Sequence, residues 1–182
     1  MRKWNAIISM VILLLFLVHM IAGIFQLTGI IAGGSRVLSI MAWVMTALIG
    51  VHTVIGCILT YSTLRSMKRA GVSYFRENQI FWARRISGFA ILFFILSHIL
   101  LFMGKNGAVY RPNLFTGPAL AGQILLVLSV AVHVISNVRP LLISLGMPSL
   151  KKFAPDILVV LSILLFLSGI AFVIYYLRWI SF

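Results

Sequence analysis

The run ISGFAILFFILSHILLFMG, residues 86–104, decides the class of this protein. It contains no Asp, Glu, Lys or Arg, and a helix of about 20 such residues crosses the hydrocarbon core of a bilayer. Similar runs bring the total to five, at roughly 5–28, 37–64, 86–104, 118–145 and 156–178. We therefore expect an all-α integral membrane protein, in which residues 1–182 form one transmembrane domain of five spanning helices.

The composition excludes a soluble globular protein. Of the 182 residues 62% are hydrophobic, and only Glu77 and Asp156 are acidic. The lone Cys57 excludes a disulfide framework and a cysteine-based metal site. The loops between the apolar runs are too short for a soluble catalytic domain, so any chemistry belongs to the helices.

The net charge of +13 follows the helix ends rather than a nucleic-acid-binding patch. One set of alternating ends carries Arg2, Lys3, Arg65, Lys68, Arg69, Arg76, Arg84, Arg85, Arg139, Lys151 and Lys152. The other set carries Arg36, Lys105, Arg111 and Arg178. This bias predicts a cytoplasmic N-terminus and an external C-terminus. The basic inner face, including the polar loop predicted at 65–85, can also dock an acidic soluble subunit.

The four histidines are the most informative polar residues in the apolar runs. They are His19, His52, His98 and His133, one on each of the first four segments. An ionisable side chain in the membrane is costly and indicates a functional site. One histidine on each of four helices is the number that two b-haems need, because each takes an axial imidazole from two facing helices.

The depths of the histidines predict how they pair. At about 1.5 Å of rise per residue, His19 and His98 lie in the outer half, His133 lies in the inner half, and His52 leans inward. We therefore predict an outer pair of His19 with His98 and an inner pair of His52 with His133. The first four helices would then form a haem-binding four-helix bundle, with the histidine-free fifth helix outside it.

Small residues lie one helical turn from three of the histidines. They are Gly23, Gly56 and Ser129, and they would leave room for a flat macrocycle, although such residues also mediate helix packing in membranes. A haem-free transporter that uses the histidines as a relay is an alternative. Transport helices usually carry a carboxylate or a break at mid-membrane, and neither acidic residue lies there.

Two motifs add a family resemblance. RRISGFAILFFILSHI, residues 84–99, is similar to the Arg-x-Ser-Gly entry into a helix that carries a haem-ligating histidine. HVISNVRPL, residues 133–141, is similar to a His–Ser–Asn–Arg helix ending. With one histidine on each of four helices, these motifs resemble the dihaem (type B) cytochrome b subunit of succinate dehydrogenase and fumarate reductase.

The resemblance implies a non-catalytic membrane anchor of a succinate:quinone oxidoreductase. The four histidines would be the axial ligands of two haems b, and the substrate in the membrane would be a quinone, with menaquinone expected. The partners would be a flavoprotein and an iron–sulfur subunit on the cytoplasmic side of a bacterial or archaeal cytoplasmic membrane. A dihaem anchor of another respiratory oxidoreductase is an alternative, although several of these place two ligands on one helix.

Further polar residues are candidates for binding these groups. Haem propionates are anionic, so Arg85, Ser87 and Arg139 at the inner rim are candidates for binding a propionate or a quinone. Gln26 and Thr28 are candidates for contacts to an outer quinone headgroup. The sequence predicts no catalytic residue.

Overall fold

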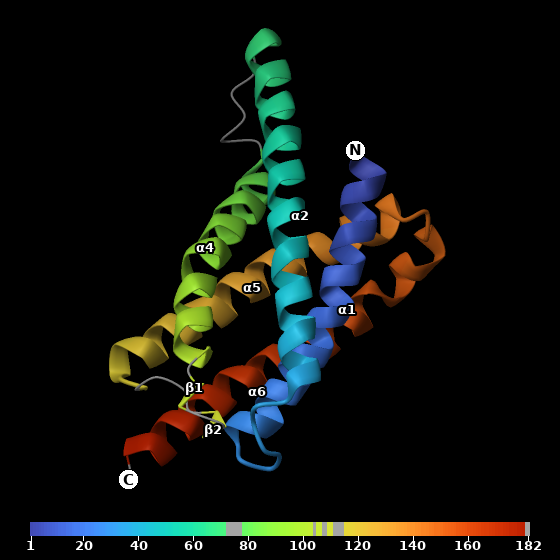
Figure 1. The fold of residues 1–182 in the computed structure, drawn as a ribbon. Coiled ribbons are helices and arrows are strands. Elements are labelled where there is room, and N and C mark those ends of the chain that lie inside the picture. The colour runs from blue at the N-terminus through green and yellow to red at the C-terminus, as the bar shows by residue number, and fades with distance from the viewer. Residues whose placement is uncertain (72–77, 104, 107–108, 111–114, 181–182) are drawn as a thin grey trace.

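Five long helices dominate the computed structural model, which describes residues 1–71, 78–103, 105–106, 109–110 and 115–180 (Figure 1). They are α1 (Arg2–Leu27), α2 (Arg36–Arg69), α4 (Gln79–Phe102), α5 (Gly117–Ser144) and α6 (Ala154–Ile180). All five are long and apolar enough to cross a membrane. The prediction of an all-α protein with five helices able to span a membrane is therefore confirmed.

Short elements connect the last three helices. The strands β1 (Lys105–Asn106) and β2 (Val109–Tyr110) pair antiparallel after α4, where the sequence indicated only a loop. A 3-10 turn, η1 (Pro148–Phe153), leads into α6.

The helices extend beyond the apolar runs that predicted them. α2 continues to Arg69, and α4 begins at Gln79 instead of residue 86, so Arg84 and Arg85 lie inside a helix. The loop predicted at 65–85 is correspondingly shorter, and residues 72–77 lie outside the described part of the chain. Hydropathy marks only the part of a helix that contacts lipid, whereas arginine, lysine and glutamine are good helix formers beyond that part.

Polar groups fix several helix ends. The hydroxyls of Ser35 and Thr116 cap α2 and α5, each accepting a backbone N–H at 3.4 Å. Gly29 follows α1 with φ of +79°, a conformation that favours glycine. A Cβ at this position would also collide with the guanidinium of Arg178, which donates to the carbonyl of Leu27 at 3.4 Å. The last turn of α6 is thereby joined to the end of α1.

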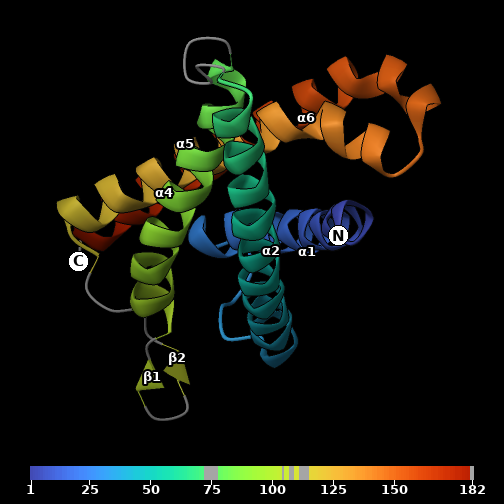
Figure 2. The same ribbon diagram turned by 90° about the horizontal axis from the view of Figure 1, so that it is seen from above.

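The packing joins two helical hairpins through the fifth helix. α1 packs on α2, α4 packs on α5, and α6 packs against both α5 and α1, as the view in Figure 2 helps to follow. A buried cluster between α5 and α6 consists of Val138, Leu142, Ala154 and Leu161, with Leu13 and Leu17 of α1 against it. In the described part of the chain, α2 does not pack closely against α4. The two hairpins are therefore held together mainly by α5, α6 and α1.

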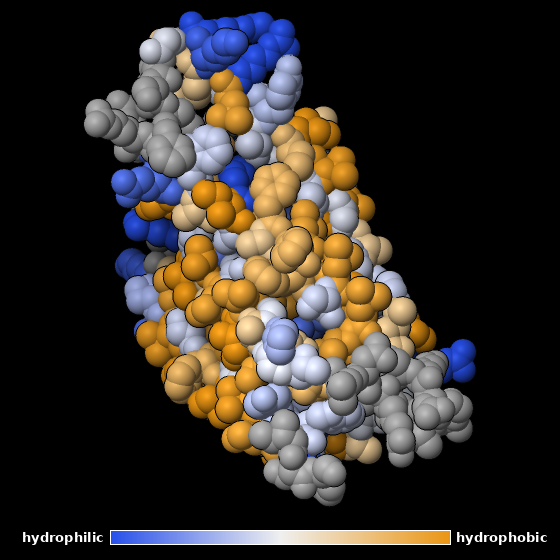
Figure 3. Space-filling model, turned by 90° about the vertical axis from the view of Figure 1, so that its left-hand side faces the viewer, coloured by the Kyte–Doolittle hydropathy of each residue, from blue (hydrophilic) through white to orange (hydrophobic). Residues whose placement is uncertain are grey.

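The outer surface of the helices is rich in apolar side chains. Large apolar side chains are exposed along the helices, among them Phe93 at 71%, Phe166 at 70% and Val54 at 60%. Figure 3 shows apolar side chains over the middle of one face and hydrophilic ones gathered at one end. The two termini lie toward opposite ends of the molecule (Figure 1). These features are compatible with an integral membrane protein.

Candidate functional site

His19 of α1 and His98 of α4 face one another. Their ring centroids are 6.0 Å apart, and the ring planes are inclined at 74°. These residues come from different hairpins, so helix packing rather than chain proximity brings them together. We call them the outer pair, after the depth that the sequence predicts for them, and they are the partners that this depth predicted.

His52 of α2 and His133 of α5 form a second pair of the same kind. Their ring centroids are 6.3 Å apart, with an interplanar angle of 88°. We call them the inner pair. Each pair takes one ring from the α1–α2 hairpin and one from the α4–α5 hairpin, so the four histidines lie along the line where the hairpins meet.

A fully buried glutamine holds His98 of the outer pair. Gln123 of α5 has no exposed surface, and its Oε1 accepts a hydrogen bond from Nδ1 of His98 at 2.7 Å. Its Nε2 donates to Ser97 Oγ at 3.4 Å. The rings of Phe102 and Phe172 lie 5.0 and 6.3 Å from the His98 ring. A buried amide in an apolar span is costly unless it is hydrogen-bonded, and here that amide fixes the orientation of an imidazole.

The inner histidines are held by backbone and hydroxyl groups. Nδ1 of His133 lies 3.1 Å from the carbonyl oxygen of Arg84 and 3.3 Å from Ser87 Oγ. Nδ1 of His52 lies 3.2 Å from Ser9 Oγ. Ser9 donates its own proton to the carbonyl of Asn5 at 2.8 Å, so it accepts the bond from His52.

These contacts assign the proton on three of the four rings. Carbonyl oxygens only accept hydrogen bonds, and the hydroxyl of Ser9 has already given its proton, so Nδ1–H is the donor in His52, His98 and His133. In a neutral imidazole, Nε2 then carries the free lone pair. In each of these rings Nε2 is therefore available to bind a metal, and Nδ1–H makes the kind of hydrogen bond that metal-bound histidines generally make.

Glycine makes room for one histidine at Gly88, while Gly23 and Gly56 have open space beside them. A Cβ on Gly88 would lie 3.3 Å from Cε1 of His133, so this glycine permits the close approach of α4 to the ring. A Cβ on Gly23 would meet no atom within 4 Å, and one on Gly56 would meet only Nη1 of Arg85 at 4.0 Å. Ser129 bonds within its own helix, to the carbonyl of Leu125 at 2.7 Å.

The structure brings two of the three inner-rim candidates to the inner pair. Ser87 is buried and contacts His133, as described above. Arg85 lies close enough to His52 and His133 to interact electrostatically, and its guanidinium carbon is 5.0 Å from the centroid of the Phe81 ring. Arg139 instead has an exposed side chain on α5, and none of the described contacts of either pair involves it.

The outer candidates lie at the end of α1. The hydroxyl of Thr28 donates to the carbonyls of Ile24 and Phe25 at 2.8 and 3.2 Å, and thus finishes its own helix. Gln26 is partly buried in the last turn. Neither residue is among the described contacts of the outer pair.

Sequence reasoning missed Gln123, Ser9 and the backbone carbonyl of Arg84. The signal for Gln123 was its place within an apolar span, because an amide that is buried in a membrane-spanning helix requires a hydrogen-bond partner. No sequence signal exists for a backbone carbonyl, since every residue has one.

The histidines are grouped in twos. In the described part of the chain, no cluster of three or more His, Cys, Asp or Glu side chains could hold a metal ion alone. Two imidazoles facing each other therefore suit a metal that brings its remaining ligands with it, as in haem. In comparisons with known proteins, no family model, curated protein or solved structure matches the chain.

Proposed function

We propose that this protein is a membrane cytochrome b that binds two haems, one between His19 and His98 and one between His52 and His133. The observation that carries the proposal is that two pairs of imidazoles lie between the helices, with ring centroids 6.0 Å apart in one pair and 6.3 Å apart in the other. The first four spanning helices would form the haem-binding bundle, with α6 against α1 and α5.

The spacing of the rings supports this assignment. A metal–imidazole bond is about 2 Å long, so two imidazoles on opposite sides of one metal have centroids about 6 Å apart. Both pairs have this separation without any displacement of their helices. The donor set also fits, because neutral imidazole nitrogen is a common axial ligand of haem iron.

Residues beside the histidines would serve the same sites. Gln123, Ser9, Ser87 and the carbonyl of Arg84 hold Nδ1 atoms and leave Nε2 free. The positive side chain of Arg85 near the inner pair would attract an anionic propionate. A bound haem supplies one-electron redox chemistry, while the helices fix the ligands and exclude water.

Haem analysis of the purified protein tests the proposal. We expect about two haems b per polypeptide from two ligands per haem, with a low-spin optical spectrum. A haem-free transporter that uses the histidines as a relay would show no absorbance in the Soret region. A haem-free preparation from cells supplied with haem would therefore overturn the proposal.

We further propose that the chain anchors a succinate:quinone oxidoreductase and carries electrons between a cytoplasmic iron–sulfur subunit and membrane quinone. The resemblance of residues 84–99 and 133–141 to the type B family supports this assignment, as does the basic end of α2. Identification of the subunits that co-purify with the intact complex is the decisive measurement. A flavoprotein with succinate or fumarate activity is expected, whereas a hydrogenase, formate dehydrogenase or nitrate reductase subunit would identify another respiratory anchor.

A further inference from the structure

Pro140 leaves one backbone carbonyl of α5 without its helical donor. It lies inside the helix and has no N–H, so the regular bond to the carbonyl of Ser136, four residues earlier, cannot form. An unsatisfied carbonyl is costly in a membrane-spanning segment, because no water is available to bond with it. The structure supplies a donor from another helix: Nε of Arg84, on α4, lies 3.0 Å from the Ser136 oxygen.

The same arginine contacts the ring of a candidate ligand. Its backbone carbonyl accepts the Nδ1–H bond of His133 at 3.1 Å, and it also accepts a bond from Ser87 Oγ at 3.2 Å. His133 and Ser136 are three residues apart and so lie on one face of α5. Arg84 is thus joined twice to that face, through its side chain to Ser136 and through its backbone to His133.

We propose that Pro140 and Arg84 act together as positioning residues for His133. Pro140 leaves the Ser136 carbonyl without a helical donor, and the guanidinium of Arg84 binds this carbonyl. The resulting cross-link sets the position of α4 along α5. In that position the backbone carbonyl of Arg84 accepts the hydrogen bond from His133. Gly88, one turn further along α4, leaves space for the ring in that position. The inference rests on the proposed function, in which His133 ligates the inner haem.

A coupled pair of substitutions in the haem-loaded protein tests the inference. Pro140→Ala restores the N–H and lets the Ser136 carbonyl bond within its own helix, while Arg84→Met removes the side-chain donor, because methionine carries no N–H. We expect each to weaken retention of the inner haem by about 10- to 100-fold, as loss of a hydrogen bond that orients a ligand does, and to alter its axial-ligand EPR signal. The double variant should lose little more haem than the more severely affected single variant, since both changes break the same contact.

Two controls separate positioning from other effects. Pro118→Ala changes a proline in the first turn of α5, where the N–H has no acceptor within the helix in any case, and it should leave both haems unchanged. Arg84→Gln loses the positive charge but keeps an N–H donor, Nε2, the same number of bonds from the backbone as Nε of the arginine, so it should retain the inner haem better than Arg84→Met. Retention of the outer haem reports that the helices are folded, and Pro140→Ala carries the test if Arg84→Met does not fold, since an unchanged inner haem in that variant would overturn the inference.

The outcomes are distinct. Additive effects of Pro140→Ala and Arg84→Met, or equal loss of the inner haem in Arg84→Gln and Arg84→Met, would overturn the positioning role without affecting the proposal that the protein binds two haems. A wild-type protein without haem would overturn the proposed function itself.

Discussion

The hydrogen bond between Gln123 and the ring of His98, with Oε1 2.7 Å from Nδ1, is shorter than those described for the rings of His52 and His133. The glutamine is fully buried, whereas the inner histidines bond to a backbone carbonyl and to hydroxyls. The two proposed sites therefore differ in the groups that orient their ligands, although the rings are spaced alike. Substitutions beside one pair should affect one haem and leave the other unchanged.

Gln123→Leu should weaken binding of the outer haem by about 10- to 100-fold, because the imidazole of His98 loses the acceptor that fixes its orientation. Ser97→Ala is the matched control, since it removes only the weaker 3.4 Å bond to the glutamine. Haem content and redox titration of the purified variants would measure both effects. Equal loss of both haems in Gln123→Leu would contradict a role confined to the outer pair.

Alanine substitutions of the histidines should act in pairs. His19→Ala and His98→Ala should each lose the same outer haem, and His52→Ala and His133→Ala the same inner one, because each pair of neighbouring rings would supply both axial ligands of one iron. Redox titration with EPR identifies which centre is lost. If the His19 and His52 variants lost the same centre, the pairing would be wrong.

Gly88→Ala should disturb the inner haem alone. The added Cβ would lie 3.3 Å from Cε1 of His133, which requires the ring to shift by a few tenths of an ångström. Gly50→Ala on α2 is the control, because a Cβ there meets no atom within 4 Å, and it should raise helix stability by up to about 1 kcal/mol. The check is to measure the potential of the inner haem and the thermal unfolding of both variants. An unchanged inner haem in Gly88→Ala would contradict the close contact between Gly88 and His133.

Arg85→Gln should lower the potential of the inner haem. A nearby cation stabilises the reduced form, and on the order of 1 kcal/mol of charge interaction corresponds to about 40 mV for one electron. Arg139→Gln should lower it less, because the Arg139 side chain is exposed and solvent or lipid headgroups screen it. Redox titration of both variants would measure these changes in potential. A shift confined to the outer haem would show that Arg85 does not lie beside the inner haem.

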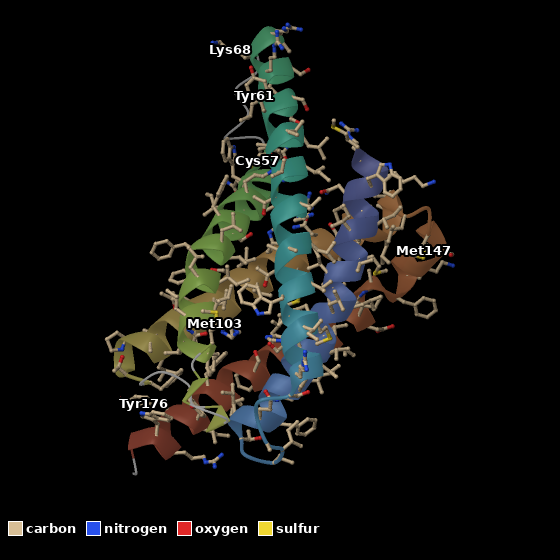
Figure 4. The ribbon with its side chains drawn as sticks, viewed as in Figure 1. Cys57, Tyr61, Lys68, Met103, Met147 and Tyr176 are labelled. Carbon is tan, nitrogen blue, oxygen red and sulfur yellow. The ribbon has the colours of Figure 1, made fainter. Side chains whose placement is uncertain are left out.

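The soluble partners should dock at the end of the molecule formed by the N-terminus, the end of α2 and the loop near residue 151. Lys68 lies at the far end of α2, as Figure 4 shows. Basic groups at this end, which include Arg65 and Arg69, can pair with acidic groups on an iron–sulfur subunit. Lysine cross-linking of the intact complex should give products at Lys3, Lys68 or Lys152. Products concentrated at Lys105, beyond α4, would place the partner on the opposite end.

The sequence by itself determined the five spanning helices and the histidine pairs. Hydropathy summed over a span is large compared with the contribution of any one residue, so the helices are evident without tertiary information. Depth follows from the fixed rise per residue, and it sufficed to match His19 with His98 and His52 with His133. The helix ends were less well predicted, as Gln79 at the start of α4 shows, because helices continue beyond the lipid.

Only the tertiary structure decided which groups hold the histidines. Gln123 lies 25 residues from His98, and Arg84 lies 49 residues from His133, so their contacts depend on the rotation and register of packed helices. One step along a helix turns a side chain by about 100°, which is why Arg139 has an exposed side chain while the preceding residue, Val138, is buried. Depth can be counted along a chain, but rotation about the helix axis is settled by the summed packing of neighbouring helices.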